Sequence, residues 1–291
     1  MKQTSNRTLT ALLVATAALL TAGCERVIFG VANRGTLPPT ARVVYAEDTG
    51  LSLDVYRPRD ASTAAPVVVF FYGGSWKRGS RDQYRFVGSR LAEHGVLAIV
   101  ADYRTFPRAG FPAFMDDAAA AVAWAKRNAA GHGGDPGRLF IAGHSAGAQI
   151  AGLLGTDKSY LRRAGVAIGD IAGVIGLAGP YDFNVGTEYA PIFGPPRQWP
   201  KAQAVNYVDG DEPPFLLVHG GKDRIVEARD SIDLDRKLRA KGGESTLLLL
   251  PDAGHFAPIA GFYEPARAPG VVAAVLRFVG AAPGGPAGAA P

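Results

Sequence analysis

Short runs of apolar residues alternate with helix-length segments along most of this chain. Apolar runs of four to eight residues, bounded by glycine, proline and polar residues, are typical of buried strands. The pattern predicts eight strands, near residues 42–47, 51–57, 66–72, 96–102, 138–143, 171–178, 214–220 and 244–250. Helices are expected over residues 82–94, 114–130, 146–155, 229–241 and 270–279. Because strands and helices alternate without a long linker, we expect one α/β domain with a mostly parallel sheet flanked by helices.

A G-x-S-x-G pattern joins a predicted strand to a predicted helix, in the residues Gly143-His144-Ser145-Ala146-Gly147. In this context the pattern indicates a nucleophile elbow, in which glycines let the backbone pack closely around a serine on a tight turn. A serine hydroxyl is a poor nucleophile at neutral pH, so it needs a histidine base, a carboxylate that orients the base, and donors for an oxyanion. Ser145 is therefore the candidate nucleophile.

A candidate carboxylate and a candidate base follow later strands, in the chain order Ser, Asp, His of this kind of site. Asp223 lies in the loop after the strand at 214–220, and His255 lies in the loop after the strand at 244–250. The carboxyl ends of parallel strands meet at one edge of a sheet, so Ser145, Asp223 and His255 should lie together. Asp223 as a helix N-cap, and Asp252 as the orienting acid, are the alternatives.

The four other histidines are interpreted as structural. They are His94, His132, His144 and His219. They form no constellation typical of a metal site, and no metal or other cofactor is expected.

A glycine-rich loop follows the strand at 66–72, with the sequence Tyr72-Gly73-Gly74-Ser75-Trp76. Glycines allow backbone N–H groups to approach a ligand, and acyl transfer needs such donors for the developing oxyanion. The residue after the nucleophile, Ala146, supplies one more donor. A plain turn is the alternative interpretation of this loop.

Six motifs occur along the chain in this order: Tyr72 to Trp76, Asp102-Tyr103-Arg104, Gly133-Gly134-Asp135-Pro136, the Ser145 elbow, Asp223 with Val226, and Gly254-His255-Phe256. Together they resemble the motifs of α/β-hydrolase carboxylesterases of the HGGxW type, which include kynurenine formamidase, feruloyl esterase-like and isoprenylcysteine methylesterase-like groups. The resemblance covers about residues 42–280, and it implies an α/β-hydrolase fold and hydrolysis of small carboxylic esters. By position it also implies that the backbone N–H groups of Gly74, Ser75 and Ala146 form the oxyanion hole. The chain departs from the family at Tyr72, where the family pattern has His.

The longest irregular segment at the catalytic edge is expected between Pro180 and Pro214, and it is rich in aromatic residues. Trp76, Tyr181 and Phe193 are the candidate substrate contacts, although such residues also serve packing. The segment is too short for a large cap domain, which favours small or extended esters over long-chain lipids.

The N-terminus has the pattern of an export signal over residues 1–23, with Lys2 and Arg7 before an apolar run that is too short to span a bilayer. The sequence Thr21-Ala22-Gly23-Cys24 resembles a bacterial lipobox, which implies lipidation of Cys24, the only cysteine. Residues 24–41 are then a linker, and residues 281–291 a disordered tail. We expect a lipid-anchored envelope protein, with Glu25 favouring the outer membrane; a soluble periplasmic or secreted protein is the alternative.

The formal charge is +5, and it is about +3 without Lys2 and Arg7. No basic run accompanies it, so no nucleic-acid partner is expected. The sequence as a whole predicts a serine carboxylesterase that forms an acyl-enzyme. Two alternatives stay open: a formamidase or amidase that uses the same residues, and a non-catalytic envelope protein that binds a ligand.

Overall fold

The computed structural model describes residues 27–58 and 64–281. Cys24, the predicted export signal and residues 282–291 of the predicted tail lie outside the described residues. Among the described helices, none combines the length and the apolar character needed to cross a bilayer.

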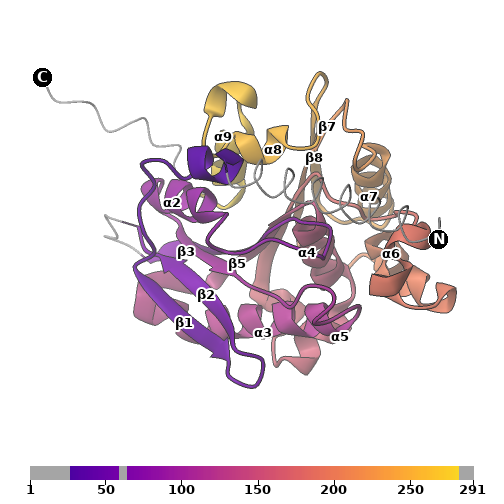
Figure 1. Cartoon of the computed structure of the whole chain (residues 1–291), viewed down its shortest axis with the longest axis horizontal. Coiled ribbons are helices and arrows are strands. Elements are labelled where there is room, and N and C mark those ends of the chain that lie inside the picture. Colours follow the sequence, from indigo (N-terminus) through magenta and orange to yellow (C-terminus); the bar gives the residue numbers. More distant parts are fainter. Residues whose placement is uncertain (1–26, 59–63, 282–291) are drawn as a thin grey trace, which may run out of the picture.

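Eight strands form one sheet in the order β1-β2-β4-β3-β5-β6-β7-β8 (Figure 1). Only β2 runs antiparallel to its neighbours, and all other pairs are parallel. The predicted eight-stranded, mostly parallel sheet is confirmed. The strands are β1 (Ala41–Ala46), β2 (Leu51–Tyr56), β3 (Ala65–Phe71), β4 (Leu97–Ala101), β5 (Gly134–His144), β6 (Ile171–Leu177), β7 (Phe215–Gly220) and β8 (Ser245–Leu250).

Helices cover both faces of the sheet. On one face α3, α4 and α5 contact one another, and α2 and α9 lie on the opposite side (Figure 1). This layering explains why all seven residues of β3 are buried, since a central parallel strand is covered on both faces. The helices are α2 (Arg85–Glu93), α3 (Ala113–Asn128), α4 (Ala146–Thr156), α5 (Lys158–Arg163), α6 (Gly186–Phe193), α7 (Arg229–Ala240), α8 (Ala257–Ala260) and α9 (Val271–Phe278).

The parallel register aligns the carboxyl ends of the strands that precede the candidate residues. Phe71 of β3 pairs with Gly143 of β5, and Gly220 of β7 pairs with Leu250 of β8. The loops after these four strands therefore leave the sheet at the same edge, although they are far apart in the sequence.

Two segments contain more regular structure than the sequence predicted. The expected linker is helical over residues 27–32, and Asn33 then holds it by hydrogen bonds to the backbone of Gln83 and Phe86. The segment expected to be irregular after Pro180 contains α6 and two 3-10 helices, Pro196–Ala202 and Ala204–Tyr207. In both cases the ordering comes from packing against the domain, which local sequence does not encode.

Candidate active site

Ser145 lies at the turn between β5 and α4 in a strained backbone conformation. Its φ is 54° and its ψ is −119°, a region that costs a residue other than glycine about 1–3 kcal/mol. A Cβ on Gly143 would lie 2.1 Å from the carbonyl oxygen of Gly147, and one on Gly147 would lie 2.1 Å from that of Phe71. Only glycines fit at these two positions, so the tight packing around the turn holds Ser145 in place.

His255 connects Ser145 to Asp223. Its Nε2 lies 2.9 Å from Ser145 Oγ, and its Nδ1 lies 2.7 Å from Asp223 Oδ2. With the proton on Nδ1, the imidazole donates to the carboxylate and accepts from the hydroxyl, which is the arrangement of a serine nucleophile with its base. The structure thus brings together the three residues that the sequence proposed.

Asp223 is held as a carboxylate by several donors. The backbone N–H groups of Ile225 and Val226 donate to its Oδ1 at 2.8 and 2.9 Å. Burial alone would raise the pKa of this carboxyl, but the hydrogen bonds from His219, His255 and Val226 outweigh it and hold the pKa well below its usual value. Asp223 therefore stays ionised across the neutral range.

His219 contributes to this site, although the sequence indicated only a structural role for it. It is fully buried, and its Nε2 lies 3.2 Å from Asp223 Oδ2 and 3.1 Å from the carbonyl oxygen of Val226. Its Nδ1 lies 2.7 Å from Ser231 Oγ, so the serine hydroxyl supplies the proton there and Nε2–H faces Asp223. The sequence offered one indication of this role, because His219 lies at the end of a strand and only four residues before Asp223.

His144 is a neutral imidazole beneath the turn. Burial lowers its pKa to about 3, so the ring is uncharged at neutral pH. Its Nδ1 lies 3.3 Å from Tyr84 Oη and its Nε2 lies 3.4 Å from the carbonyl oxygen of His255. His144 thereby supports the loop that carries His255.

The 72–76 loop packs directly against the serine turn. A Cβ on Gly73 would lie 3.0 Å from Ser145 Cβ, which shows how closely the two segments approach. Within residues 27–58 and 64–281, the backbone N–H groups of Gly74, Ser75 and Ala146 donate to no protein acceptor. They remain available to a ligand oxygen near Ser145, as an oxyanion hole requires.

Tyr72 stands where the HGGxW pattern has His, and it supports the loop by a different contact. Its ring stacks on Tyr103 at a centroid distance of 4.7 Å, and Tyr103 Oη donates to the Tyr72 carbonyl oxygen at 2.8 Å. Both side chains are buried. The pair fixes the start of the loop without the histidine.

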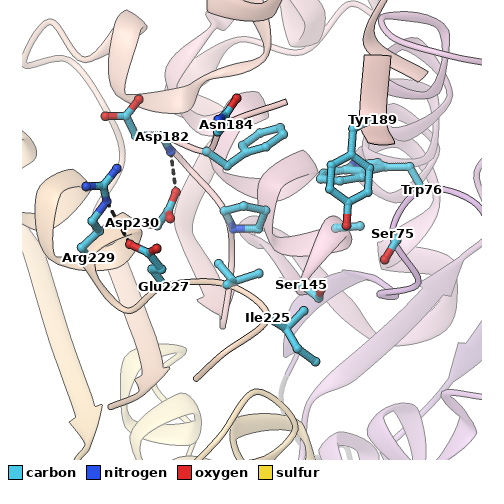
Figure 2. Close-up of a pocket in the computed structure, with 14 residues that line it drawn as sticks. Ser75, Trp76, Ser145, Asp182, Asn184, Tyr189, Ile225, Glu227, Arg229 and Asp230 are labelled. Carbon is cyan, nitrogen blue, oxygen red and sulfur yellow. Dashed lines mark hydrogen bonds and ion pairs between the residues drawn. The ribbon is translucent and has the colours of Figure 1, made fainter. Parts of the chain in front are cut away.

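A cavity of about 200 Å³ opens beside Ser145 (Figure 2). Ser75, Trp76 and Tyr189 lie on one side of it, and the charged residues Asp182, Glu227, Arg229 and Asp230 gather on the other side (Figure 2). We refer to it as the polar cavity.

Two of the three expected substrate contacts are not at the cavity. Trp76 lines it, but Tyr181 and Phe193 are fully buried and do not. Tyr181 packs against the glycines of α4 and β6. The Phe193 ring packs edge-on against the Trp76 ring, with 4.8 Å between the ring centroids. Phe183 and Tyr189 from the same segment line the cavity in their place. The aromatic composition indicated the right segment, but it could not tell which rings face inward.

The alternative acid, Asp252, points elsewhere. Its side chain is 88% exposed and forms an ion pair with Lys222 at 2.6 Å. In the part of the chain that the structure describes, no group of three His, Cys, Asp or Glu residues is placed to hold a metal ion.

Comparison with known proteins identifies similar sequences and folds. Residues 53–238 match the BD-FAE family model. Esterase LipC of Mycobacterium tuberculosis is 33% identical over 238 residues, which are 74% of this chain and 59% of LipC. Isoprenylcysteine alpha-carbonyl methylesterase ICME of Arabidopsis thaliana is 28% identical over 73% of this chain and 55% of its own length. The chain thus spans little more than half of these two relatives.

A solved structure shares the fold over nearly its whole length. The butyrate-bound esterase Est2 of Thermogutta terrifontis has a TM-score of 0.71 and 21% sequence identity. The alignment covers 87% of this chain and 97% of Est2. At this identity the likeness is one of fold.

Proposed function

The chain belongs to the BD-FAE family, and from this membership we propose that it is a serine carboxylesterase that hydrolyses small carboxylic esters. Its fold is the α/β-hydrolase fold that the sequence predicted. The names of LipC, ICME and Est2, all esterases, support the same activity.

The observation that carries the proposal is the continuous hydrogen-bonded series from Ser145 through His255 to Asp223, at 2.9 and 2.7 Å. Ser145 Oγ attacks the ester carbonyl while His255 Nε2 takes its proton. Asp223 orients the imidazole and stabilises its charge. The N–H groups of Gly74, Ser75 and Ala146 bind the oxyanion, each donor contributing about 3 kcal/mol of transition-state stabilisation. His255 returns the proton to the leaving alcohol, and water then hydrolyses the acyl-enzyme.

A fluorophosphonate probe tests this function, because it labels a serine only when that serine is activated. We expect labelling of the purified protein at Ser145 and none in Ser145→Ala. Hydrolysis of a matched panel of esters, amides and formamides should be fastest with the esters. A folded Ser145→Ala variant with unchanged turnover would refute the assignment, and a preference for formamides would favour the formamidase alternative.

We further propose that the protein is anchored to the bacterial cell envelope through lipidation of Cys24. The lipobox-like sequence supports this, and two or more acyl chains hold a protein stably at a membrane where one does not. Membrane fractionation with a labelled fatty acid tests it. The label should follow the protein into the membrane fraction and be lost in Cys24→Ser. An unlabelled, soluble wild-type protein would instead support the secreted or periplasmic alternative.

A further inference from the structure

A second and larger cavity also opens at Ser145. Its volume is about 480 Å³, within the usual range of about 300–1,000 Å³ for ligand pockets, whereas the polar cavity at about 200 Å³ is below it. Ser75, Ser145 and Ile225 line both. A bound ester at Ser145 can therefore extend one of its two halves into each cavity.

The position of His255 decides which half enters which cavity. His255 lines the larger cavity and does not line the polar one. When the bond between the carbonyl carbon and the alcohol oxygen breaks, that oxygen takes the proton that His255 Nε2 received from Ser145. The alcohol oxygen must lie within hydrogen-bonding reach of Nε2. The larger cavity thus receives the alcohol, and the polar cavity receives the acyl group.

The larger cavity has an apolar wall made of side chains that are exposed to solvent. Of the seven exposed large hydrophobic residues in the described ranges, five line it. Such clustering marks a binding surface, because singly exposed apolar residues are normally scattered. The five are Val27, Ile28, Val31, Ile225 and Phe256. We refer to this space as the apolar cavity.

The helix over residues 27–32 is fixed firmly enough to serve as a wall. The Phe29 ring lies 5.3 Å from the Tyr84 ring, and Asn33 Oδ1 accepts a hydrogen bond from the Phe86 N–H at 2.9 Å. Further along, the Leu37 N–H donates to Ser89 Oγ at 3.0 Å. These contacts tie the helix to α2 and to the segment before it.

We propose that the enzyme selects esters that join a short acyl group to a bulky, apolar alcohol, with the alcohol bound in the apolar cavity against the 27–32 helix. This inference rests on the proposed ester hydrolysis and names its substrate class. The acyl side is limited by the small size of the polar cavity and by its charged far end. The alcohol side has more than twice that volume and an apolar wall.

Two ester series measured with the purified protein separate the two cavities. One series holds the acyl group at acetyl and lengthens the alcohol from ethyl to octyl; the other holds ethanol and lengthens the acyl group from acetyl to dodecanoyl. We expect kcat/KM to rise at least about tenfold along the first series, as burial of several CH₂ groups implies, and to fall along the second. The reverse ranking would overturn the orientation that we propose.

A matched pair of variants tests the wall itself. Val31 lines the apolar cavity and Val44 lies on β1 outside it, with similar exposed fractions of 48% and 53%. Val31→Ser should lower kcat/KM for octyl acetate about fourfold to tenfold, and the loss with ethyl acetate, whose alcohol is short, should be smaller. Val44→Ser should change neither. Equal effects of the two variants would overturn the proposal.

Two other outcomes are distinguishable. A protein that hydrolyses neither series and resists the fluorophosphonate probe refutes the proposed function as a whole. A protein that is labelled and active, but indifferent to alcohol size, refutes only the present inference. If Val31→Ser weakens attachment to phospholipid vesicles while both ester profiles stay as in the wild type, the apolar residues form a membrane-contacting surface and the substrate proposal is wrong.

Discussion

Trp76 on the 72–76 loop donates a hydrogen bond from Nε1 to Gln149 Oε1 on α4, at 3.1 Å. Both side chains are buried, and Gln149 Nε2 donates in turn to the carbonyl oxygen of Ala202 at 2.9 Å. One glutamine therefore connects three segments around the site: the loop with the candidate oxyanion donors, the helix that follows Ser145, and the aromatic segment beside the polar cavity. The sequence motifs of the 72–76 loop and of the serine turn did not predict this link.

Replacing Gln149 by Leu should destabilise the protein and slow turnover. The change leaves the Trp76 N–H and the Ala202 carbonyl buried without partners, which costs about 1–3 kcal/mol for each group. Because the 72–76 loop loses its anchor, kcat should fall more than KM rises. Denaturant unfolding and steady-state kinetics measure both effects. Gln198→Leu is the control, since the Gln198 side chain makes no hydrogen bond to a described residue; equal losses in the two variants would refute the explanation.

Asp223→Asn should cost far more activity than Asp252→Asn. Asp223 holds His255 in the reactive tautomer, and losses from such a change can reach about 10⁴-fold. Asp252 is exposed and paired with Lys222 at the surface, so its replacement should change kcat/KM by less than about twofold. The rates of acylation by an aryl acetate compare the two variants directly. A larger loss in Asp252→Asn would make Asp252 the orienting acid.

His219→Leu should lower kcat/KM about tenfold and shift the pH profile. Asp223 loses one of its donors, and a hydrogen bond to a charged group is worth about 1.5–3 kcal/mol. With fewer donors the pKa of Asp223 rises, so the carboxylate is lost at a higher pH on acidification. The acidic limb of the activity profile should therefore move to higher pH. A variant with lower activity but an unmoved acidic limb would indicate a purely structural role for His219.

The sequence predicted most of the sheet and the three residues at its edge, because both depend on short-range patterns. The run Val67–Phe71 is apolar throughout because β3 is covered on both faces, and Ser145, Asp223 and His255 each follow such a run. Strand order then brings the three together. Their roles as nucleophile, acid and base stay predictions until the variants are measured.

Other features could not be predicted, since they depend on which side chains meet in the folded chain. Tyr181 and Tyr189 belong to the same aromatic segment, yet the first is buried against glycines and the second lines the polar cavity. The helix over residues 27–32 has exposed apolar residues and no strong capping signal, and it is held by α2 and the segment before it. The same applies to His219, whose contact with Asp223 depends on the path of the loop after β7.

The buried, neutral His144 should make stability depend on pH. Its pKa is about 3 in the folded protein against an ordinary value of 6.5, so the unfolded chain binds a proton between these values and the folded protein does not. The free energy of unfolding should therefore fall as the pH drops below 6.5, by up to about 1.4 kcal/mol per pH unit until about pH 3. In His144→Gln this part of the slope should vanish. Urea unfolding between pH 7 and 4 measures it, and parallel curves for both proteins would contradict the assignment.

Gly147→Ala should disrupt the fold around the site, whereas Gly131→Ala should be harmless. A Cβ on Gly147 would lie 2.1 Å from the carbonyl oxygen of Phe71, far inside van der Waals contact, and a backbone atom in a central strand has little room to move. Either β3 and the 72–76 loop move away from Ser145, or α4 moves away from β3. We expect a loss of about 3 kcal/mol or more, together with loss of labelling by the fluorophosphonate probe.

Gly131 provides the comparison for this change, because nothing lies within 4 Å of the Cβ that alanine would add there. Its replacement should alter the free energy of unfolding by less than about 0.5 kcal/mol, as is usual at the surface. Melting curves and probe labelling of the two variants, measured side by side, compare a buried glycine at the serine turn with one that faces open space. If Gly147→Ala melted and reacted like Gly131→Ala, the close approach of β3 to the turn would not be what holds Ser145 in its strained conformation.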